Sequence, residues 1–177
     1  MNSETPDYRP KVSLERRVAA FAIDLTLVAL ISSLLTTSPW PRTLLFIILW
    51  LGMRVVWVSK NQGQSLGRWA LDMRVIDLRL NRTPGLYELI KREGFLALCA
   101  ALTVAGLAGL TSRNASVLIL MLPLVLDICV ALVDQERHPQ AFHDRLAHTI
   151  IIGSRRGYSL DIKLRYLLDT LERNMRR

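Results

Sequence analysis

The sequence has only two cysteines among its 177 residues, Cys99 and Cys129, and both lie inside apolar stretches. A small secreted domain held together by disulfides needs more cysteines, so that class is excluded. Aromatic residues make up only 7% of the chain, which argues against a protein that stacks on nucleic-acid bases. With 51% hydrophobic residues, the chain is too apolar to be disordered.

Charged residues are nearly absent from four apolar segments, 18–35, 40–58, 94–110 and 115–133. Each segment is close to the roughly 17–25 residues that a helix needs to cross a bilayer. None has the polar stripe of a soluble amphipathic helix, so lipid is the expected surrounding. Segment 18–35 is followed by no clear cleavage site and is expected to be retained. The sequence therefore predicts an all-α integral membrane protein, a bundle of four transmembrane helices.

Lysine and arginine are nearly absent from the two loops expected on the outer face. Of the 23 residues of these types, only Arg42 and Arg113 fall there, and the other 21 fall on the opposite side. Because positive residues collect on the cytoplasmic side, we expect both termini to be cytoplasmic in a bacterial-type inner or internal membrane. The net charge of +8 is then a signal of topology, and no nucleic-acid partner is expected.

The parts outside the membrane are expected to be small. Residues 1–17 form an N-terminal tail, and residues 18–153 form the membrane domain with a cytoplasmic loop at 59–93. Residues 65–71 predict a short helix capped by Ser65. Residues 73–77 and 148–153 are strand-like, and we expect them to pair because a lone strand leaves its backbone groups unsatisfied.

Residues 154–177 are predicted to form a cytoplasmic, basic, amphipathic helix. From residue 159 onward, leucines recur at steps of three and four, and Lys and Arg occupy the other face. The pattern leaves open whether this helix packs on the rest of the cytoplasmic part, binds anionic lipid or docks to a partner.

Apart from Arg42 near the start of segment 40–58, three charged residues interrupt the apolar segments: Asp24, Arg54 and Asp127. A carboxylate in hydrocarbon costs about 2.5–3.5 kcal/mol on insertion scales, so it needs a partner, protein or water around it. At a rise of 1.5 Å per residue, both carboxylates lie about 9 Å from the cytoplasmic ends of their helices. We predict an intramembrane charge cluster of these three residues, with Arg54 in reach of either carboxylate. Arg17 is expected to pair with Asp144, just outside the apolar segments.

Small residues recur every four positions along segment 94–110, at Ala97, Ala101, Ala105 and Gly109. Such a stripe lets another helix approach closely. We interpret it as a packing surface, either within the bundle or between two copies of the chain.

Motifs that carry catalysis or bind metals are missing from the sequence. His138, His143 and His148 are spaced five apart and no cysteine accompanies them, which is a poor metal-binding pattern. There is no nucleophile elbow and no phosphate-binding loop. We therefore expect no metal, no cofactor and no enzymatic activity.

An ordered set of motifs resembles the RDD family of membrane proteins. Arg17-Val-Ala-Ala-Phe-Ala-Ile-Asp24 resembles its opening signature, and Asp144 in His143-Asp144-Arg145-Leu146-Ala147-His148-Thr149 resembles its later aspartate. Gln64-Ser65-Leu66-Gly67-Arg68, Arg74-Val75-Ile76-Asp77 and Arg92 resemble the part between them. The similarity runs from about residue 16 to 152, with Asp72 and His148 where the family pattern usually has glycine. It implies a small multipass module with family positions Arg17, Asp24 and Asp144, but no settled activity.

Two functions fit the sequence. The outer halves of the apolar segments hold no ionisable group, so a single copy lacks the polar path that ion movement requires. We therefore predict a non-enzymatic accessory, assembly or structural subunit, whose partners are the lipid bilayer and another membrane protein or a second copy. The alternative is a subunit of an oligomeric small-cation or proton transporter, an activity suggested for members of the family that the sequence resembles.

Overall fold

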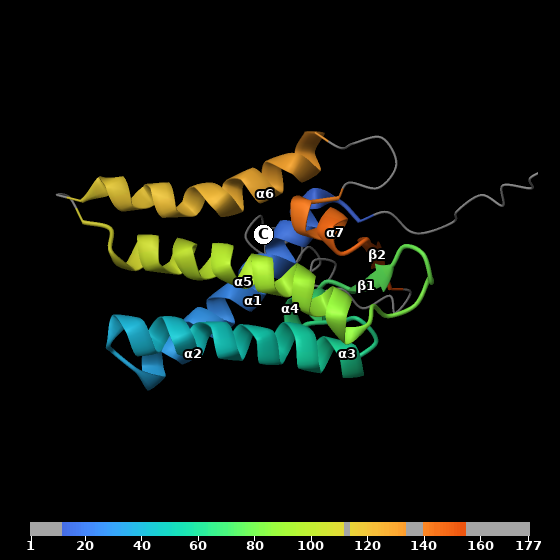
Figure 1. Ribbon diagram of the computed structural model, residues 1–177, viewed down its shortest axis with the longest axis horizontal. Helices are drawn as coiled ribbons and strands as arrows, with labels where there is room; N and C mark the ends of the chain where they lie inside the picture. The colour runs from blue at the N-terminus through green and yellow to red at the C-terminus, as the bar shows by residue number, and fades with distance from the viewer. Residues whose placement is uncertain (1–11, 112–113, 134–139, 155–177) are drawn as a thin grey trace, which may run out of the picture.

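A computed structural model describes residues 12–111, 114–133 and 140–154 of the chain. Its long helices are α1 (Leu14–Leu35), α2 (Pro39–Leu51), α5 (Leu86–Ala108) and α6 (Leu122–Val133). α2, α5 and α6 run lengthwise, and α1 crosses obliquely behind them (Figure 1). α2 continues through the π-helix η1 (Gly52–Trp57) into α3 (Val58–Lys60), and the 3-10 helix η2 (Ala115–Met121) leads into α6. The short elements are α4 (Leu66–Ala70), β1 (Met73–Asp77), α7 (Phe142–Leu146) and β2 (Thr149–Gly153). All four of these lie at one end of the bundle, which we term the charged end (Figure 1).

Local sequence explains where the helices begin. The Ser13 side chain accepts a hydrogen bond from the backbone N–H of Arg16 and so caps α1. Pro39 occupies the first position of α2, where a missing N–H costs nothing. Gly85 caps α5 directly after Pro84, which separates this helix from the preceding turn.

Among the described residues, three helices are long and apolar enough to cross a membrane: Leu14–Leu35, Pro39–Lys60 and Ala115–Val133. Residues 94–108 of the remaining predicted span lie in α5, which is 23 residues long but is not among these three helices. α5 begins eight residues earlier than the predicted segment 94–110, so its first turns carry charges that were assigned to loop 59–93. The helix continues through Gly94 because Leu89 packs against Val55 and Val58 while the neighbouring Arg92 and Glu93 find buried partners.

The predicted helix 115–133 is present, but its first part is a 3-10 helix and not an α-helix. Pro123 has no N–H to donate to the carbonyl of Ile119. That carbonyl instead accepts the backbone N–H of Leu122, a bond of the 3-10 type. The Ile119 carbonyl therefore keeps a backbone hydrogen-bond partner despite the proline.

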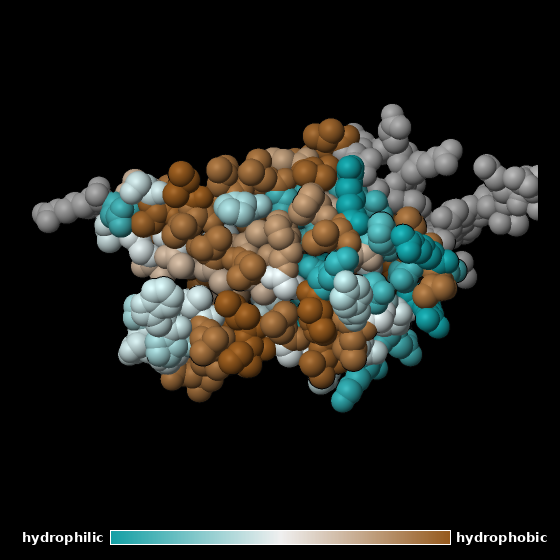
Figure 2. All heavy atoms as spheres, viewed as in Figure 1, coloured by the Kyte–Doolittle hydropathy of each residue, from teal (hydrophilic) through white to brown (hydrophobic). Residues whose placement is uncertain are grey.

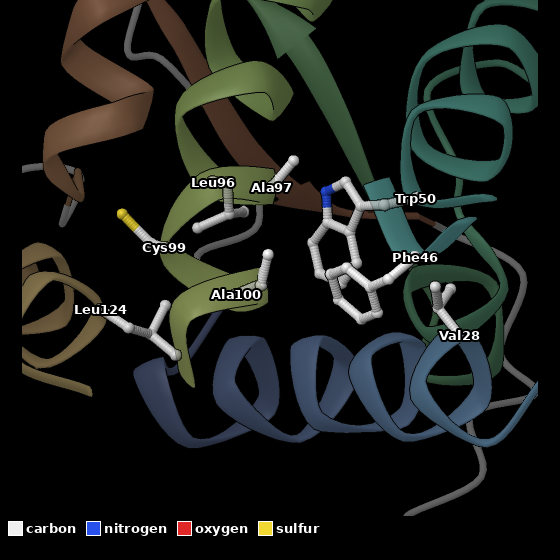
Figure 3. Packing of buried hydrophobic residues seen from close by; sticks show 9 residues of the cluster. Val28, Phe46, Trp50, Leu96, Ala97, Cys99, Ala100 and Leu124 are labelled. Carbon is white, nitrogen blue, oxygen red and sulfur yellow. The ribbon is translucent and has the colours of Figure 1, made fainter. Parts of the chain in front are cut away.

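The apolar core lies between α1, α2, α5 and α6. Phe46 and Trp50 project from α2 toward α5, with ring centroids 5.6 Å apart (Figure 3). They face Ala97 and Ala100 of α5, where small side chains leave room for the aromatic rings. The predicted small-residue stripe is thus split. The two members that come first along α5, Ala97 and Ala101, are buried in the core. The later two, Ala105 and Gly109, are exposed and line a cavity beside α2.

The two predicted strands pair in antiparallel fashion, with Val75 opposite Ile151. The residue preceding each strand has a positive φ, 57° at Asp72 and 51° at His148. This left-handed conformation favours glycine, which explains why the pattern described above usually has glycine at these two positions.

The outer surface is that of a membrane protein. Figure 2 shows hydrophobic residues over the long helices and hydrophilic residues gathered at the charged end. Large apolar side chains such as Leu30, Ile48 and Ile119 are more than half exposed. A soluble monomer rarely presents so extensive an apolar surface, so these side chains face lipid. The predicted tail helix 154–177 and most of tail 1–17 lie outside the described residues.

Candidate functional site

Asp24, on α1, is completely buried and accepts three hydrogen bonds. The donors are Arg54 Nη1 at 2.8 Å, the Ser65 hydroxyl at 2.6 Å and the backbone N–H of Gly67 at 2.7 Å. A buried carboxylate is costly unless its oxygens are hydrogen-bonded, and these three donors satisfy Asp24. The predicted contact between Asp24 and Arg54 is therefore present, and α4 supplies two further donors.

Gly67 is required for α4 to reach Asp24. A Cβ atom at this position would lie 2.1 Å from the backbone oxygen of Ala20 and 3.1 Å from Asp24 Oδ1. Only glycine lets the backbone of α4 approach α1 so closely. The Ser65 hydroxyl also accepts the backbone N–H of Arg68, so one side chain both caps α4 and contacts Asp24.

Arg54 lies in the π-helical part of the second span and connects α1 to α5. Its Nη1 contacts Asp24, and its Nε donates to Glu93 Oε2 at 2.7 Å. The guanidinium carbon also lies 4.8 Å from the ring centroid of Trp50, a cation–π contact. π-helical turns often occur at functional sites, and this one carries the arginine that joins the two carboxylates.

Glu93 extends the network to residues outside the predicted cluster. Its Oε1 accepts from Arg68 Nη2 at 2.8 Å and lies 3.8 Å from Arg92 Nε. Arg92 Nη2 in turn lies 2.6 Å from Asp144 Oδ1, and Asp144 Oδ2 lies 3.8 Å from Arg17 Nη1. The expected proximity of Arg17 and Asp144 is therefore present, with Arg92 as a much closer partner of the carboxylate.

These contacts form one continuous chain of ion pairs. It runs from Asp24 through Arg54, Glu93, Arg92 and Asp144 to Arg17. Arg17 also donates to the backbone oxygen of Ile151 at 3.1 Å and so ties α1 to β2. The three positions singled out by resemblance, Arg17, Asp24 and Asp144, thus belong to one network that joins α1, the second span, α5 and α7.

Asp127 does not contact Arg54, in contrast to the predicted cluster. Its carboxylate accepts the backbone N–H of His143 at 3.0 Å, and its Oδ2 lies 2.6 Å from His143 Nδ1. The other ring nitrogen, Nε2, lies 3.3 Å from Arg92 Nη2. Because arginine can only donate, Nε2 acts as the acceptor and Nδ1 carries the proton toward Asp127. Asp127 is therefore linked to the network through His143 and Arg92.

The pKa values of Arg68 and Asp144, two network residues outside the long helices, are shifted for different reasons. Burial lowers the pKa of Arg68, and the nearby charges of Arg54 and Arg92 act in the same direction. For Asp144, burial alone would raise the pKa. The positive charges of Arg92, Arg17 and Arg68 more than offset burial, so the pKa of Asp144 lies below its usual value.

Sequence reasoning missed Glu93, Arg92, Arg68 and His143 as members of the site. Arg92 and Glu93 are adjacent charges directly before an apolar run, and no helix breaker stands between Gly85 and that run. That signal indicates a helix which enters the membrane with buried charges. Within residues 12–111, 114–133 and 140–154, the structure brings no three metal-ligating side chains into a cluster.

The fold and the buried network define a helical integral membrane protein whose spanning helices are joined by ion pairs at one end. The RDD family model matches residues 11–148, and the chain belongs to the RDD family. Comparison with curated proteins and with solved structures gave no match.

Proposed function

We propose that this protein is a non-enzymatic accessory, assembly or structural subunit of a membrane complex. The observation that carries the proposal is the closure of the network: each of its four carboxylates contacts an arginine or histidine of the same chain. A cation carrier needs oxygen ligands that are available to the ion. Carboxylates that are already paired serve instead to hold the helix ends together.

The distribution of polar groups also supports this role. Residues 25–35, 43–53, 95–111 and 114–126 contain no Asp, Glu, Lys, Arg or His. The buried hydroxyls of Ser32 and Thr103 donate to carbonyls of their own helices. These segments therefore provide no charged side chain along which an ion could move toward the end of the bundle opposite the network.

A competing role is cation or proton movement by an oligomer. It is favoured by the ionisable groups that line a cavity at the charged end, among them Asp127 and His143. In that case a second copy would have to complete the path, with Ala105 and Gly109 as the surface that meets it.

The two roles are separated by reconstitution. Purified protein in liposomes should dissipate Na⁺, K⁺ and pH gradients no faster than empty liposomes do. The variant Asp24→Asn preserves the shape of the carboxylate and removes its charge, so it serves as the matched comparison. Gradient-driven flux that is lost in a folded Asp24→Asn protein would overturn the accessory role.

The accessory role further expects a stoichiometric partner in mild detergent. Deletion of residues 159–177 should release that partner while the membrane domain stays inserted, because the spans need only their own apolar length and internal hydrogen bonds. The mass of the intact complex, measured with and without the deletion, shows whether the partner is still bound. A complex that becomes lighter only by the mass of the deleted segment would show that the tail does not hold the partner.

A further inference from the structure

A cavity of about 60 Å³ lies at the charged end, with walls from α1, α5, α6 and α7. Four arginines line it, Arg17, Arg54, Arg68 and Arg92, against two carboxylates, Asp127 and Asp144. The remaining wall is largely apolar. Arginines thus outnumber carboxylates among the lining residues, although Arg54 and Arg68 are also paired with Asp24 and Glu93, which do not line the cavity.

Donors of two arginines lack acceptors at the cavity. Arg68 and Arg92 are 2% and 0% exposed, so water on the protein surface does not solvate them. Arg68 Nη1 and Arg92 Nη1 and Nε are buried and have no hydrogen-bond partner within the described part of the chain. Leaving such a charged donor unsatisfied is costly, which indicates that another group accepts from these atoms.

Most of the acceptors nearby are already engaged. Glu93 Oε1 lies 2.8 Å from Arg68 Nη2 and 3.8 Å from Arg92 Nε, so the two guanidinium groups are neighbours around one oxygen. Asp127 is occupied by two contacts to His143. Asp144 Oδ1 lies 2.6 Å from Arg92 Nη2 but accepts no hydrogen bond within the described residues. Three donor atoms of Arg68 and Arg92 thus lack a partner against one acceptor atom, so the site is short of hydrogen-bond acceptors.

We propose that this cavity binds a small monovalent inorganic anion, with Arg68 and Arg92 as its ligands. A cavity needs roughly 10–15 Å³ of probe space to hold one water, so about 60 Å³ accommodates an ion of chloride size with a few waters. The bound anion screens the repulsion between the two guanidinium groups and accepts from their unpaired N–H groups. This site is independent of the proposed accessory role, because it concerns the stability of the network and not its partners.

The test is thermal unfolding of the purified, delipidated protein in an uncharged detergent. Sodium chloride replaces sodium gluconate at constant ionic strength, and the midpoint is followed against chloride concentration. A ligand that binds only the folded state raises the midpoint, so we expect a saturable increase of about a few degrees. Equal midpoints in chloride and gluconate would overturn the proposal and leave the cavity merely hydrated.

Two variants separate the site from a general effect of salt. Arg92→Lys keeps the charge but removes the Nη1 and Nε donors, and it should lose most of the chloride-dependent increase. Arg74→Gln removes one exposed arginine on β1 that does not line the cavity, and it should keep the increase in full. A full chloride effect in Arg92→Lys would contradict the assignment.

A second measurement does not depend on a variant that folds. ³⁵Cl resonances should broaden in the presence of wild-type protein, and added bromide should reverse the broadening by competition. Phosphatidylglycerol is added in gluconate as a separate arm. Stabilisation by this lipid without any effect of chloride would show that a lipid headgroup, and not a free anion, occupies the site, and would overturn the proposal.

Discussion

The backbone N–H of Gly67 donates to the buried carboxylate of Asp24 across 2.7 Å, which fixes α4 against the middle of α1. The contact depends on the absence of a side chain, because a Cβ atom would lie 2.1 Å from the backbone oxygen of Ala20. The short helix α4 therefore contributes hydrogen-bond donors to a carboxylate that lies in a membrane-spanning helix.

Gly67→Ala should destabilise the protein by about 1–3 kcal/mol, the usual cost of inserting atoms into a packed site. The added methyl group pushes α4 away and lengthens the bond to Asp24. Gly94→Ala is the matched control, since a Cβ at that helical position meets nothing within 4 Å. It should be neutral or stabilising by up to about 1 kcal/mol. Unfolding of both variants in mixed micelles measures the difference, and equal stability would contradict the close-approach argument.

Removal of Asp24 should strand the positive charge of Arg54. Asp24→Leu is expected to cost about 3–5 kcal/mol, the range for breaking a buried ion pair from one side. In the double variant Asp24→Leu/Arg54→Leu the cost should be smaller than the sum of the single changes. The free energies of unfolding of all four proteins test this, and strict additivity would show that the two residues are not energetic partners.

The helices, the strand pair and the contacts of Arg54 with Asp24 and of Arg17 with Asp144 could be anticipated from the sequence. They follow from charge-free runs, from β-branched segments and from the cost of unpaired charge in lipid. Glu93 could not be found in this way, because a pattern based on apolar runs places it in the loop before Gly94. The partner of Asp127 could not be found either. His143 lies 16 residues further on and reaches Asp127 only through the position of α7.

The left-handed backbone at His148 offers a stabilising substitution. Its φ of 51° costs a residue with a Cβ about 1–2 kcal/mol, and its side chain is exposed. His148→Gly should therefore raise the stability by up to about 1 kcal/mol. His148→Ala removes the imidazole without relieving the backbone, so it should show no gain. A similar gain from both variants would assign the effect to the imidazole instead.

The stability of the protein should depend on pH through Asp144. Its pKa is depressed in the folded state, so its contribution is fully present above the unfolded value of about 3.9 and is lost as the pH falls through the folded value. The difference in unfolding free energy between wild type and Asp144→Asn should be constant above about pH 5 and should shrink in more acidic solution. Chemical unfolding at a series of pH values measures this difference. A difference that persists unchanged to pH 2 would mean that Asp144 remains fully ionised there or contributes nothing through its charge.

The number of crossings rests on α5, whose first turns are charged and whose apolar part from residue 94 to Ala108 is short. If α5 crosses the membrane, Thr111 lies outside and the C-terminus returns to the side that holds 21 of the 23 Lys and Arg residues. If α5 does not cross, Thr111 stays inside and α6 carries the C-terminus out. A Thr111→Cys variant, built on a background with Cys99→Ala and Cys129→Ala, should react with a membrane-impermeant maleimide added to intact cells. A reporter fused after Arg177 should be active only in the cytoplasm. A three-span arrangement reverses both readouts at once. Protection of residue 111 from the maleimide, combined with an exterior C-terminus, would therefore establish three crossings and place the start of η2 on the cytoplasmic face.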